Sequence, residues 1–278
     1  MAPYVIDLLE KTEKESEFFG AGVNLYSVIN SYYGWSLGWC GNFEEGEPFL
    51  EKGLLFAAEI NHRNTLAIVE LIFGFFFNAK GEGENAIKHF LNSIKYIEEV
   101  KYLHILGAAW TGLGWGYHLL GEQEKARMHV EEGIKILNDL GIRYHVSRSY
   151  FVLTMVHFAS GDLRSARLSA EKAIELSQNC DEKHFEAISK TWLGRIFGRD
   201  KRSEVSKVTP HIYEGIKILD ELRLKPFSAQ GYLFLGELHA DKVQKDIAVE
   251  NLKKAERMFK EMGMDYWLAK TQEIQDRV

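Results

Sequence analysis

The side chains that could do chemistry in this chain are 10 histidines, 2 cysteines and 40 acidic residues. Their spacing matches no familiar catalytic or metal-binding motif, since the sequence has no G-x-x-x-x-G-K-[ST], H-E-x-x-H, C-x-x-C or G-x-S-x-G. Cys40 and Cys180 lie 140 positions apart, which suits neither a disulfide framework nor a pair of metal ligands. No nucleophile or acid has an activating neighbour at a recognisable spacing. The sequence therefore predicts no enzyme, no metal site and no cofactor.

One segment imitates a dinucleotide-binding loop. The run from Gly81 to Ala86, GEGENA, has the glycine spacing of that fingerprint. The fingerprint requires a preceding strand, whereas the apolar pattern before Gly81 is helical. We therefore interpret the run as a turn between two helices.

Composition points to a helical protein. The chain has 278 residues with only 4 prolines, and the helix formers Leu, Ala, Glu, Lys and Ile dominate it. A net charge of -6 and a pI near 6.0, without a run of five like charges, disfavour nucleic acid and anionic membranes as partners. The most apolar stretch, Leu66 to Ala79, contains Glu70 and is too short to span a bilayer. The absence of a signal-peptide pattern leads us to expect cytoplasmic residence.

A fixed period organises the chain. Small residues recur in two columns, at a spacing of 40 residues apart from one two-residue insertion between Gly194 and Gly215. The first column is Gly34, Gly74, Gly114, Thr154, Gly194 and Gly236, and the second is Gly53, Ser93, Gly133, Ala173, Gly215 and Ala255. Small residues let two helices approach closely, so the columns indicate helix crossings in six successive hairpins.

These features resemble the tetratricopeptide repeat (TPR) family. The pattern W-x2-L-G-x2-Y from Trp110 to Tyr117 matches the first helix of that repeat, and A-x3-F from Ala86 to Phe90 matches its second helix. The resemblance covers residues 22–278, although the period exceeds the usual length of about 34 residues. It implies an all-α fold, a right-handed α-solenoid of about six TPR-like hairpins with longer helices.

The chain is expected to form a single superhelical domain, 1–278. We assign residues 1–20 to a half-repeat, with one helix in 3–19, and residues 264–278 to a capping helix. The repeats between them are 22–61, 62–101, 102–141, 142–181, 182–224 and 225–263. The fifth repeat departs most from the pattern, because Val208 replaces a small residue and charged residues 199–202 occupy its turn. We expect a looser hairpin there.

The last part of the chain has a second resemblance. It is carried by GIKILDELRLKP at 215–226, AQGYLFLGEL at 229–238 and EMGMDYWLAK at 261–270. These sequence segments resemble the C-terminal TPR region of bacterial signalling proteins that join a class III nucleotide cyclase domain to a STAND-type ATPase. Neither a cyclase metal-binding region nor a phosphate loop occurs in the chain. The resemblance implies a regulatory or docking tail of a larger signalling protein.

The TPR resemblance also implies a binding surface. In that family the first helices line the concave face, and the residue after the signature glycine points into it. The predicted peptide-binding or ligand-binding groove comprises Trp35, Trp39, Phe75, Asn78, Trp115, His118, Arg148, Phe151, Met155, Phe158, Arg195 and Arg199. Aromatic and arginine side chains carry much of the energy at protein interfaces. We therefore expect a protein or peptide partner, including other domains of the same polypeptide.

Four alternatives remain open from the sequence. The apolar positions could be buried in a tightly curled superhelix, and the arginines could lie on solvated helix faces. An aromatic-lined cavity could hold a small molecule, which would make the chain a sensor controlling an upstream cyclase or ATPase. The half-repeat at Pro3 to Phe19, with an apolar face from Tyr4 to Leu9, could form a homodimer through the terminal repeats.

Overall fold

Helices make up all the regular structure in the part of the chain that the computed structural model describes, residues 1–199 and 204–278. A 3-10 turn, η1 (Leu103–Ile105), precedes α6. The helices are α1 (Ala2–Lys11), α2 (Leu25–Trp39), α3 (Phe43–Glu59), α4 (Arg63–Lys80), α5 (Gly83–Val100), α6 (Leu106–Leu119), α7 (Gln123–Asp139), α8 (Val146–Ala159), α9 (Leu163–Asn179), α10 (Lys183–Gly198), α11 (Val205–Glu221), α12 (Lys225–Asp241), α13 (Lys245–Met262) and α14 (Asp265–Gln275).

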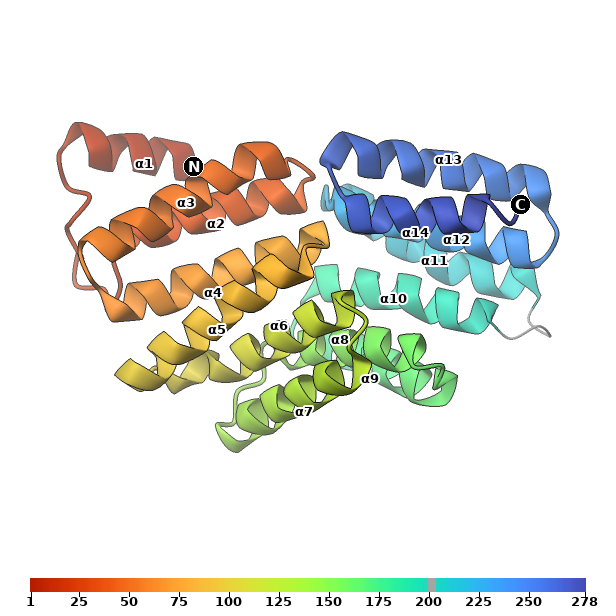
Figure 1. The fold of residues 1–278 in the computed structure, drawn as a ribbon, viewed down its shortest axis with the longest axis horizontal. Helices are drawn as coiled ribbons and strands as arrows, with labels where there is room; N and C mark the ends of the chain where they lie inside the picture. The colour runs from red at the N-terminus through yellow and green to blue at the C-terminus, as the bar shows by residue number, and fades with distance from the viewer. Residues whose placement is uncertain (200–203) are drawn as a thin grey trace.

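Six helical hairpins stack in chain order: α2 with α3, α4 with α5, α6 with α7, α8 with α9, α10 with α11 and α12 with α13 (Figure 1). This arrangement confirms the predicted all-α solenoid. The glycine columns lie at the crossings. In the first hairpin, a Cβ atom on Gly34 would lie only 2.4 Å from the carbonyl oxygen of Gly46. A bulkier residue would therefore force α2 and α3 apart.

The segment that imitates a nucleotide loop is a turn, as predicted. Gly81 ends α4 in the left-handed conformation with φ of 99°, and α5 begins at Gly83. Glycine adopts this conformation without the steric cost that a Cβ atom imposes. The run from Gly81 to Ala86 therefore forms the turn and the start of the second helix of a hairpin, and not a phosphate-binding loop.

The N-terminal half-repeat is shorter than predicted. Helix α1 ends at Lys11, and Glu13 adopts the left-handed conformation with φ of 54°, so no helix continues to residue 19. Ile6 and Leu9 pack against Tyr26 of α2. Val5 is half-buried against the same cluster, whereas Tyr4 and Leu8 on α1 are 69% and 45% exposed.

The C-terminal helix closes the stack as predicted. In α14, Trp267 and Ile274 are buried, while the half-buried Tyr266 and Leu268 also pack against the main core. In the fifth hairpin, Val208 is buried in α11. Of the charged turn at 199–202, residues 200–202 lie outside the described residues.

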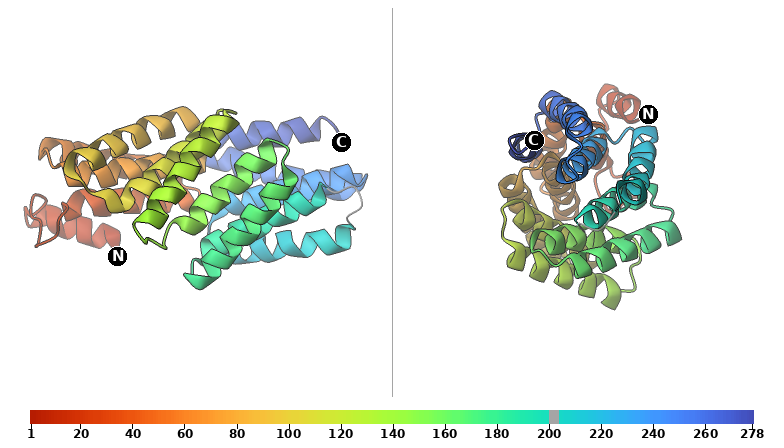
Figure 2. Two further views of the ribbon diagram at one scale, coloured as in Figure 1. Left: turned by 90° about the horizontal axis from the view of Figure 1, so that it is seen from below. Right: turned by 90° about the vertical axis from the view of Figure 1, so that its right-hand side faces the viewer.

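The superhelix curls so far that its first hairpin contacts its last. The ring of Trp39, at the end of α2, lies 5.2 Å from the ring of Phe227 in α12. Directly after α2, a Cβ on Gly41 would lie 2.7 Å from the sulfur of Met262. Figure 1 shows α2 and α3 beside the group α12 to α14, and Figure 2 shows the hairpins arranged around a central axis. The first helices of the hairpins therefore surround an interior.

Across residues 1–199 and 204–278, none of the helices combines the length and the apolar character needed to cross a bilayer.

Candidate functional site

The structure divides the predicted groove residues into three groups along the superhelix axis. Those in the middle fill the interior and are Trp39, Asn78, Trp115 and Phe151. Those at one end line a cavity and are Trp35, Phe75 and Arg148. Those at the other end line a second cavity and are His118, Met155, Phe158, Arg195 and Arg199.

An aromatic plug closes the middle of the interior. The rings of Trp115 and Phe151 meet edge to face with centroids 5.5 Å apart, and Phe151 lies 6.1 Å from Phe185. Phe185 in turn contacts Trp39, which reaches Phe227 across the closure of the superhelix. All five side chains are buried. Edge-to-face contacts of this kind stabilise a core beyond their buried area. At this level the interior is packed core, so the expectation of an exposed groove fails here.

Asn78 belongs to the same packed layer. Its side-chain amide nitrogen on α4 donates a hydrogen bond of 2.9 Å to the backbone oxygen of Gly112 on α6. The residue is 1% exposed, and a ligand in either cavity does not reach it. Asn78 therefore fixes the approach of two neighbouring inner helices.

The N-terminal cavity has a volume of about 270 Å³. Its lining residues come from α2, from α4, from the segments that precede α6 and α8, and from the start of α8. Apolar and aromatic groups form most of its wall, among them Tyr32, Trp35, Phe75, Tyr102, His104, Tyr144 and His145. Arg148 is the one arginine or lysine among its lining residues.

Arg148 is buried without an anionic partner. It is 8% exposed, and its guanidinium carbon lies 4.0 Å from the ring centre of Phe75 and 5.1 Å from that of Phe185. Among the described residues, none forms a hydrogen bond or ion pair with this guanidinium, and its Nε is fully buried. Burial lowers the pKa of Arg148 to about 10, against the smaller opposing effect of Glu182. The Glu182 carboxylate accepts a hydrogen bond from the Ser147 hydroxyl instead.

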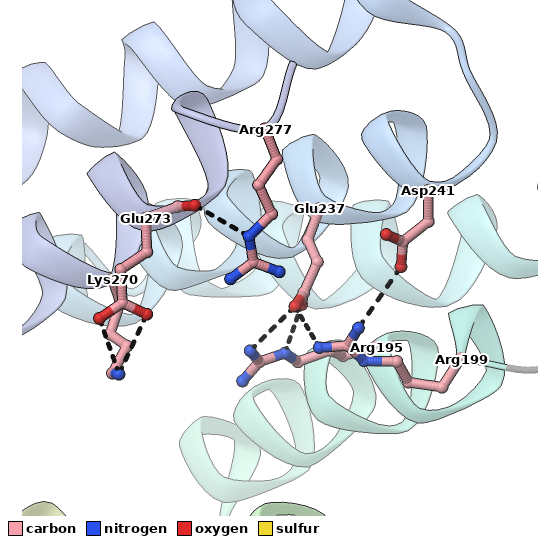
Figure 3. A network of polar contacts seen from close by, with 7 residues as sticks. All are labelled: Arg195, Arg199, Glu237, Asp241, Lys270, Glu273 and Arg277. Atoms are coloured by element: carbon pink, nitrogen blue, oxygen red, sulfur yellow. Dashed lines mark hydrogen bonds and ion pairs between the residues drawn. The ribbon is translucent and has the colours of Figure 1, made fainter.

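The C-terminal cavity, about 240 Å³ in volume, is polar and charged. Figure 3 shows Arg195 and Arg199 of the fifth hairpin converging on the carboxylate of Glu237 in α12. The Nε of Arg195 donates to Glu237 at 2.7 Å, and Arg199 also contacts Asp241 at 3.5 Å. Burial raises the pKa of Glu237, but Arg195 and Arg199 together outweigh this effect and lower it. Glu237 therefore remains ionised and anchors both arginines.

Aromatic rings hold Arg195 from the other side. Its guanidinium carbon lies 4.5 Å from the ring centre of Phe158 and 4.4 Å from that of Phe234. Cations bind to the faces of aromatic rings, and more strongly where water is excluded. Neither Arg148 nor Arg195 lies on a solvated helix face, so that alternative is wrong for these two.

The end of the chain supplies the rim of the C-terminal cavity. Lys270 of α14 pairs with Glu273 at 3.1 Å, and the Nε of Arg277 donates to the backbone oxygen of Glu273 (Figure 3). Arg277 also lies close enough to help lower the pKa of Glu237. The lining residues therefore carry four cations, from Arg195, Arg199, Lys270 and Arg277, against two carboxylates. The opening favours anionic groups.

His118 and Met155 are the buried groove candidates in the lining of this cavity. His118 is 7% exposed and its Nδ1 lies 2.8 Å from the side-chain oxygen of Gln123. Burial lowers the pKa of His118 to about 4, so it is neutral at pH 7. Met155 is 1% exposed, while Phe158 is half-buried against Trp192. Of these three, Phe158 offers the most surface to a partner.

Sequence reasoning missed residues in both cavities. Tyr102, His104, Tyr144 and His145 precede α6 and α8, in the connecting segments rather than in the helices. Lys270 of α14 lines the other cavity because α14 packs against α12, which also lines it. The aromatic residues that repeat before α6 and α8 were the available signal for the first set. Within residues 1–199 and 204–278, His, Cys, Asp and Glu form no cluster of three that could hold a metal ion.

The sequence matches no protein-family model, and no curated protein matches it. Solved structures do match. RapI in its apo form has a TM-score of 0.66 at 14% identity, over 91% of this chain and 90% of RapI. A Rap protein complexed with Competence and Sporulation Factor has a TM-score of 0.67 at 13% identity, over 96% of this chain and 76% of that chain. A STAND protein with a tetratricopeptide repeat sensor from Pyrococcus horikoshii has a TM-score of 0.56 at 20% identity, over 91% of this chain.

These similarities show that the chain has a TPR-like superhelical fold. At identities this low, the likeness concerns the backbone arrangement and not the side chains in the cavities. The chain spans 38% of the length of the STAND protein, so it resembles one region of that larger protein.

Proposed function

We propose that this TPR-like superhelix is a non-catalytic interaction module that binds a protein or peptide segment at its C-terminal cavity. The observation that carries the proposal is the chemistry of that opening. A half-buried aromatic ring, Phe158, lies beside Arg195 and Arg199, with Arg277 on the rim. Aromatic and arginine side chains in a partly desolvated depression are typical of interaction hot spots.

The charge distribution specifies the partner further. Arg195 and Arg199 already form ion pairs with Glu237. The cations that can donate further hydrogen bonds to a partner are therefore those on the rim of the cavity. Lys270 is exposed, and Arg277 uses only its Nε in its hydrogen bond to Glu273. An acidic side chain can bind to this rim while an adjacent apolar side chain contacts Phe158. We therefore expect a short segment that pairs an acidic residue with an aromatic or large aliphatic one.

The structural comparisons support a regulatory context. One Rap structure contains a bound Competence and Sporulation Factor, and the STAND protein carries its repeats as a sensor. By analogy, we propose that this chain acts as a regulatory or docking tail of a larger signalling protein. Its partner would then be another domain of the same polypeptide or a separate protein. The free thiols Cys40 and Cys180 agree with the cytoplasmic residence that we propose for it.

Peptide selection tests this function directly. A phage-displayed library panned against the whole chain should enrich acidic and aromatic sequences that bind with micromolar affinity. Phe158→Ala and Arg277→Glu should each weaken these peptides at least tenfold, because they remove the apolar contact or reverse the charge of the rim. Arg257→Glu is the matched control, since Arg257 is an exposed arginine on α13 outside the cavity. Enriched peptides that bind both variants as well as the control would contradict the proposal.

A further inference from the structure

The N-terminal cavity contains a positive charge, on Arg148, that has no anionic partner among the described residues. Arg148 is more than nine-tenths buried, lines the cavity and makes no hydrogen bond or ion pair with any described residue. Its planar face is occupied by Phe75 and Phe185, but ring faces do not satisfy its N–H donors. Burying an unpaired charge is costly, so a site that keeps one is suited to an anion from outside the chain.

The start of α8 adds a second positive element at the same place. His145 occupies the N-cap position with φ of 74°, a left-handed conformation that is rare for residues other than glycine. No side chain caps the helix, so the backbone N–H groups of its first turn lack the usual acceptor. His145 and Arg148 both line the cavity, one helical turn apart. An anion beside Arg148 would also be stabilised by this helix N-terminus.

We propose that the N-terminal cavity binds a ligand with a single carboxylate on an aromatic body, with the carboxylate on the Arg148 guanidinium and the aromatic body against Trp35. This site is separate from the C-terminal cavity and does not depend on the function proposed for it. The ligand can be a small aromatic acid or a peptide that ends in an aromatic residue, because both present the same two groups.

Charge balance favours a carboxylate over a phosphate. Arg148 supplies one positive charge, and the helix N-terminus adds about half a charge. His145 and His184 flank Arg148 but are neutral, because burial and the charge of Arg148 lower their pKa values to about 3 and about 4. A dianionic phosphate would leave excess negative charge in a partly buried site, whereas a monocarboxylate is matched and can accept two parallel hydrogen bonds from a guanidinium.

The walls of the cavity favour an aromatic body. Tyr32, Trp35, Tyr102 and Tyr144 surround it, and the Trp35 ring is already stacked at a tilt on Trp39 with centroids 4.5 Å apart. Trp35 is half-buried, and Tyr32 and Tyr144 are 50% and 47% exposed, so ring surface is available to a ligand. A volume of about 270 Å³ lies just below the usual range for ligand pockets, roughly 300–1,000 Å³, and fits a ligand with one ring system.

Calorimetric titration of the whole chain tests the ligand chemistry. The probes are benzoate, its neutral analogue benzamide and inorganic phosphate. Benzoate should bind at least tenfold more tightly than benzamide and phosphate. Equal binding of benzoate and benzamide, or no binding of benzoate at millimolar concentrations, would overturn the proposal. 3-Phenylpropionate and the tripeptide Gly-Gly-Phe then distinguish the sources, since tenfold tighter binding of the tripeptide supports a chain terminus and the reverse supports a free acid.

A matched pair of variants tests the position of the site. Arg148→Met removes the buried charge and should abolish the preference for benzoate over benzamide. Arg143→Met removes an exposed arginine five residues earlier and should leave that preference unchanged. Retention of the preference in a folded Arg148→Met protein would overturn the proposal.

Should Arg148→Met fail to fold, ligand-observed fluorescence keeps the test decisive. Benzoate should change the tryptophan emission of the wild type, and Trp35→Phe should remove that change, because Trp35 is the tryptophan in the cavity wall. An unaltered benzoate response in Trp35→Phe would place the ligand elsewhere and overturn the assignment.

Discussion

The guanidinium of Arg148 lies 4.0 Å from the ring centre of Phe75, with no carboxylate at salt-bridge distance among the described residues. The contact joins α8 to α4 across α6 and forms the base of the N-terminal cavity. A buried cation that contacts only aromatic rings stabilises the folded protein less than one that also has an anionic partner. The same unpaired cation is available to an anionic ligand. We therefore expect Arg148 to lower the stability of the ligand-free protein while it promotes ligand binding.

The first prediction concerns that conflict. Arg148→Met should raise the stability of the ligand-free protein by about 1 kcal/mol, because an apolar side chain of similar length avoids the cost of a buried charge. For a chain of this size such a gain raises the melting temperature by about 2–4 °C. Thermal unfolding followed by circular dichroism measures it. A lower melting temperature would mean that the ring contacts outweigh the cost of burial.

The second prediction concerns the C-terminal cavity. Glu237→Gln removes the charge that pairs with Arg195 and Arg199, and should destabilise the protein by about 3 kcal/mol, as expected when one partner of a buried ion pair is lost. Glu273→Gln removes an exposed carboxylate nearby and should change stability by less than about 0.5 kcal/mol. Urea unfolding of both variants gives the comparison. Equal effects would show that the buried network contributes no more than a surface pair.

The third prediction follows from the burial of His118. Its folded-state pKa of about 4 lies below the ordinary value of 6.5, so the unfolded chain binds the proton first as the pH falls. Stability from this group is present above pH 6.5 and declines between pH 6.5 and about 4, by an amount of about 3 kcal/mol. His118→Gln should make that part of the stability profile less steep, while His145 and His184, whose pKa values are also lowered, continue to contribute to it. A variant with the same slope as the wild type would exclude His118 as its source.

The fourth prediction uses two glycines with opposite surroundings. Gly34→Ala places a Cβ atom 2.4 Å from the Gly46 carbonyl and should destabilise the protein by about 1–3 kcal/mol. Gly22→Ala places its Cβ in open space and should have little effect or a small stabilising one. Chemical denaturation of the pair measures the difference. A harmless Gly34→Ala would mean that α2 and α3 can separate at no cost.

The fifth prediction tests the homodimer that the sequence leaves open as an alternative. Tyr4 and Leu8 lie one helical turn apart on the solvent face of α1, where they form an apolar surface. Sedimentation at micromolar concentration should therefore detect a dimer that Leu8→Lys dissociates. Leu55→Lys, at an exposed position on α3, should leave it intact. A monomeric wild type, or a dimer that survives Leu8→Lys, would show that α1 is not a dimer interface.

The solenoid could be predicted from the sequence because its repeat depends on local sterics. Residues such as Gly34 and Gly114 must be small wherever two helices of a hairpin cross, and this requirement recurs at every unit. Helix α1 was predicted too long, since the left-handed conformation of Glu13 is not signalled by a glycine. Local patterns therefore identified the hairpins and the C-terminal helix better than the N-terminal segment.

The cavities could not be predicted in the same way. Whether Trp115 and Phe151 face solvent depends on the curvature of the whole array, which accumulates from small rotations between units. The contact of Trp39 with Phe227 joins opposite ends of the chain and has no counterpart in the repeat pattern. Tyr102 and Tyr144 lie in segments that connect helices, whereas the repeat pattern compares positions within the helices and so does not include them.

The contact of Trp39 with Phe227 also changes how the array should come apart. Open solenoids have two free termini, so their outermost units fray first and melting proceeds inward. Here the outermost hairpins brace each other, and neither can detach without breaking a seam that both share. The molecule should therefore lose its structure in one concerted step, with amide protons of the first and last hairpins exchanging as slowly as those in the middle.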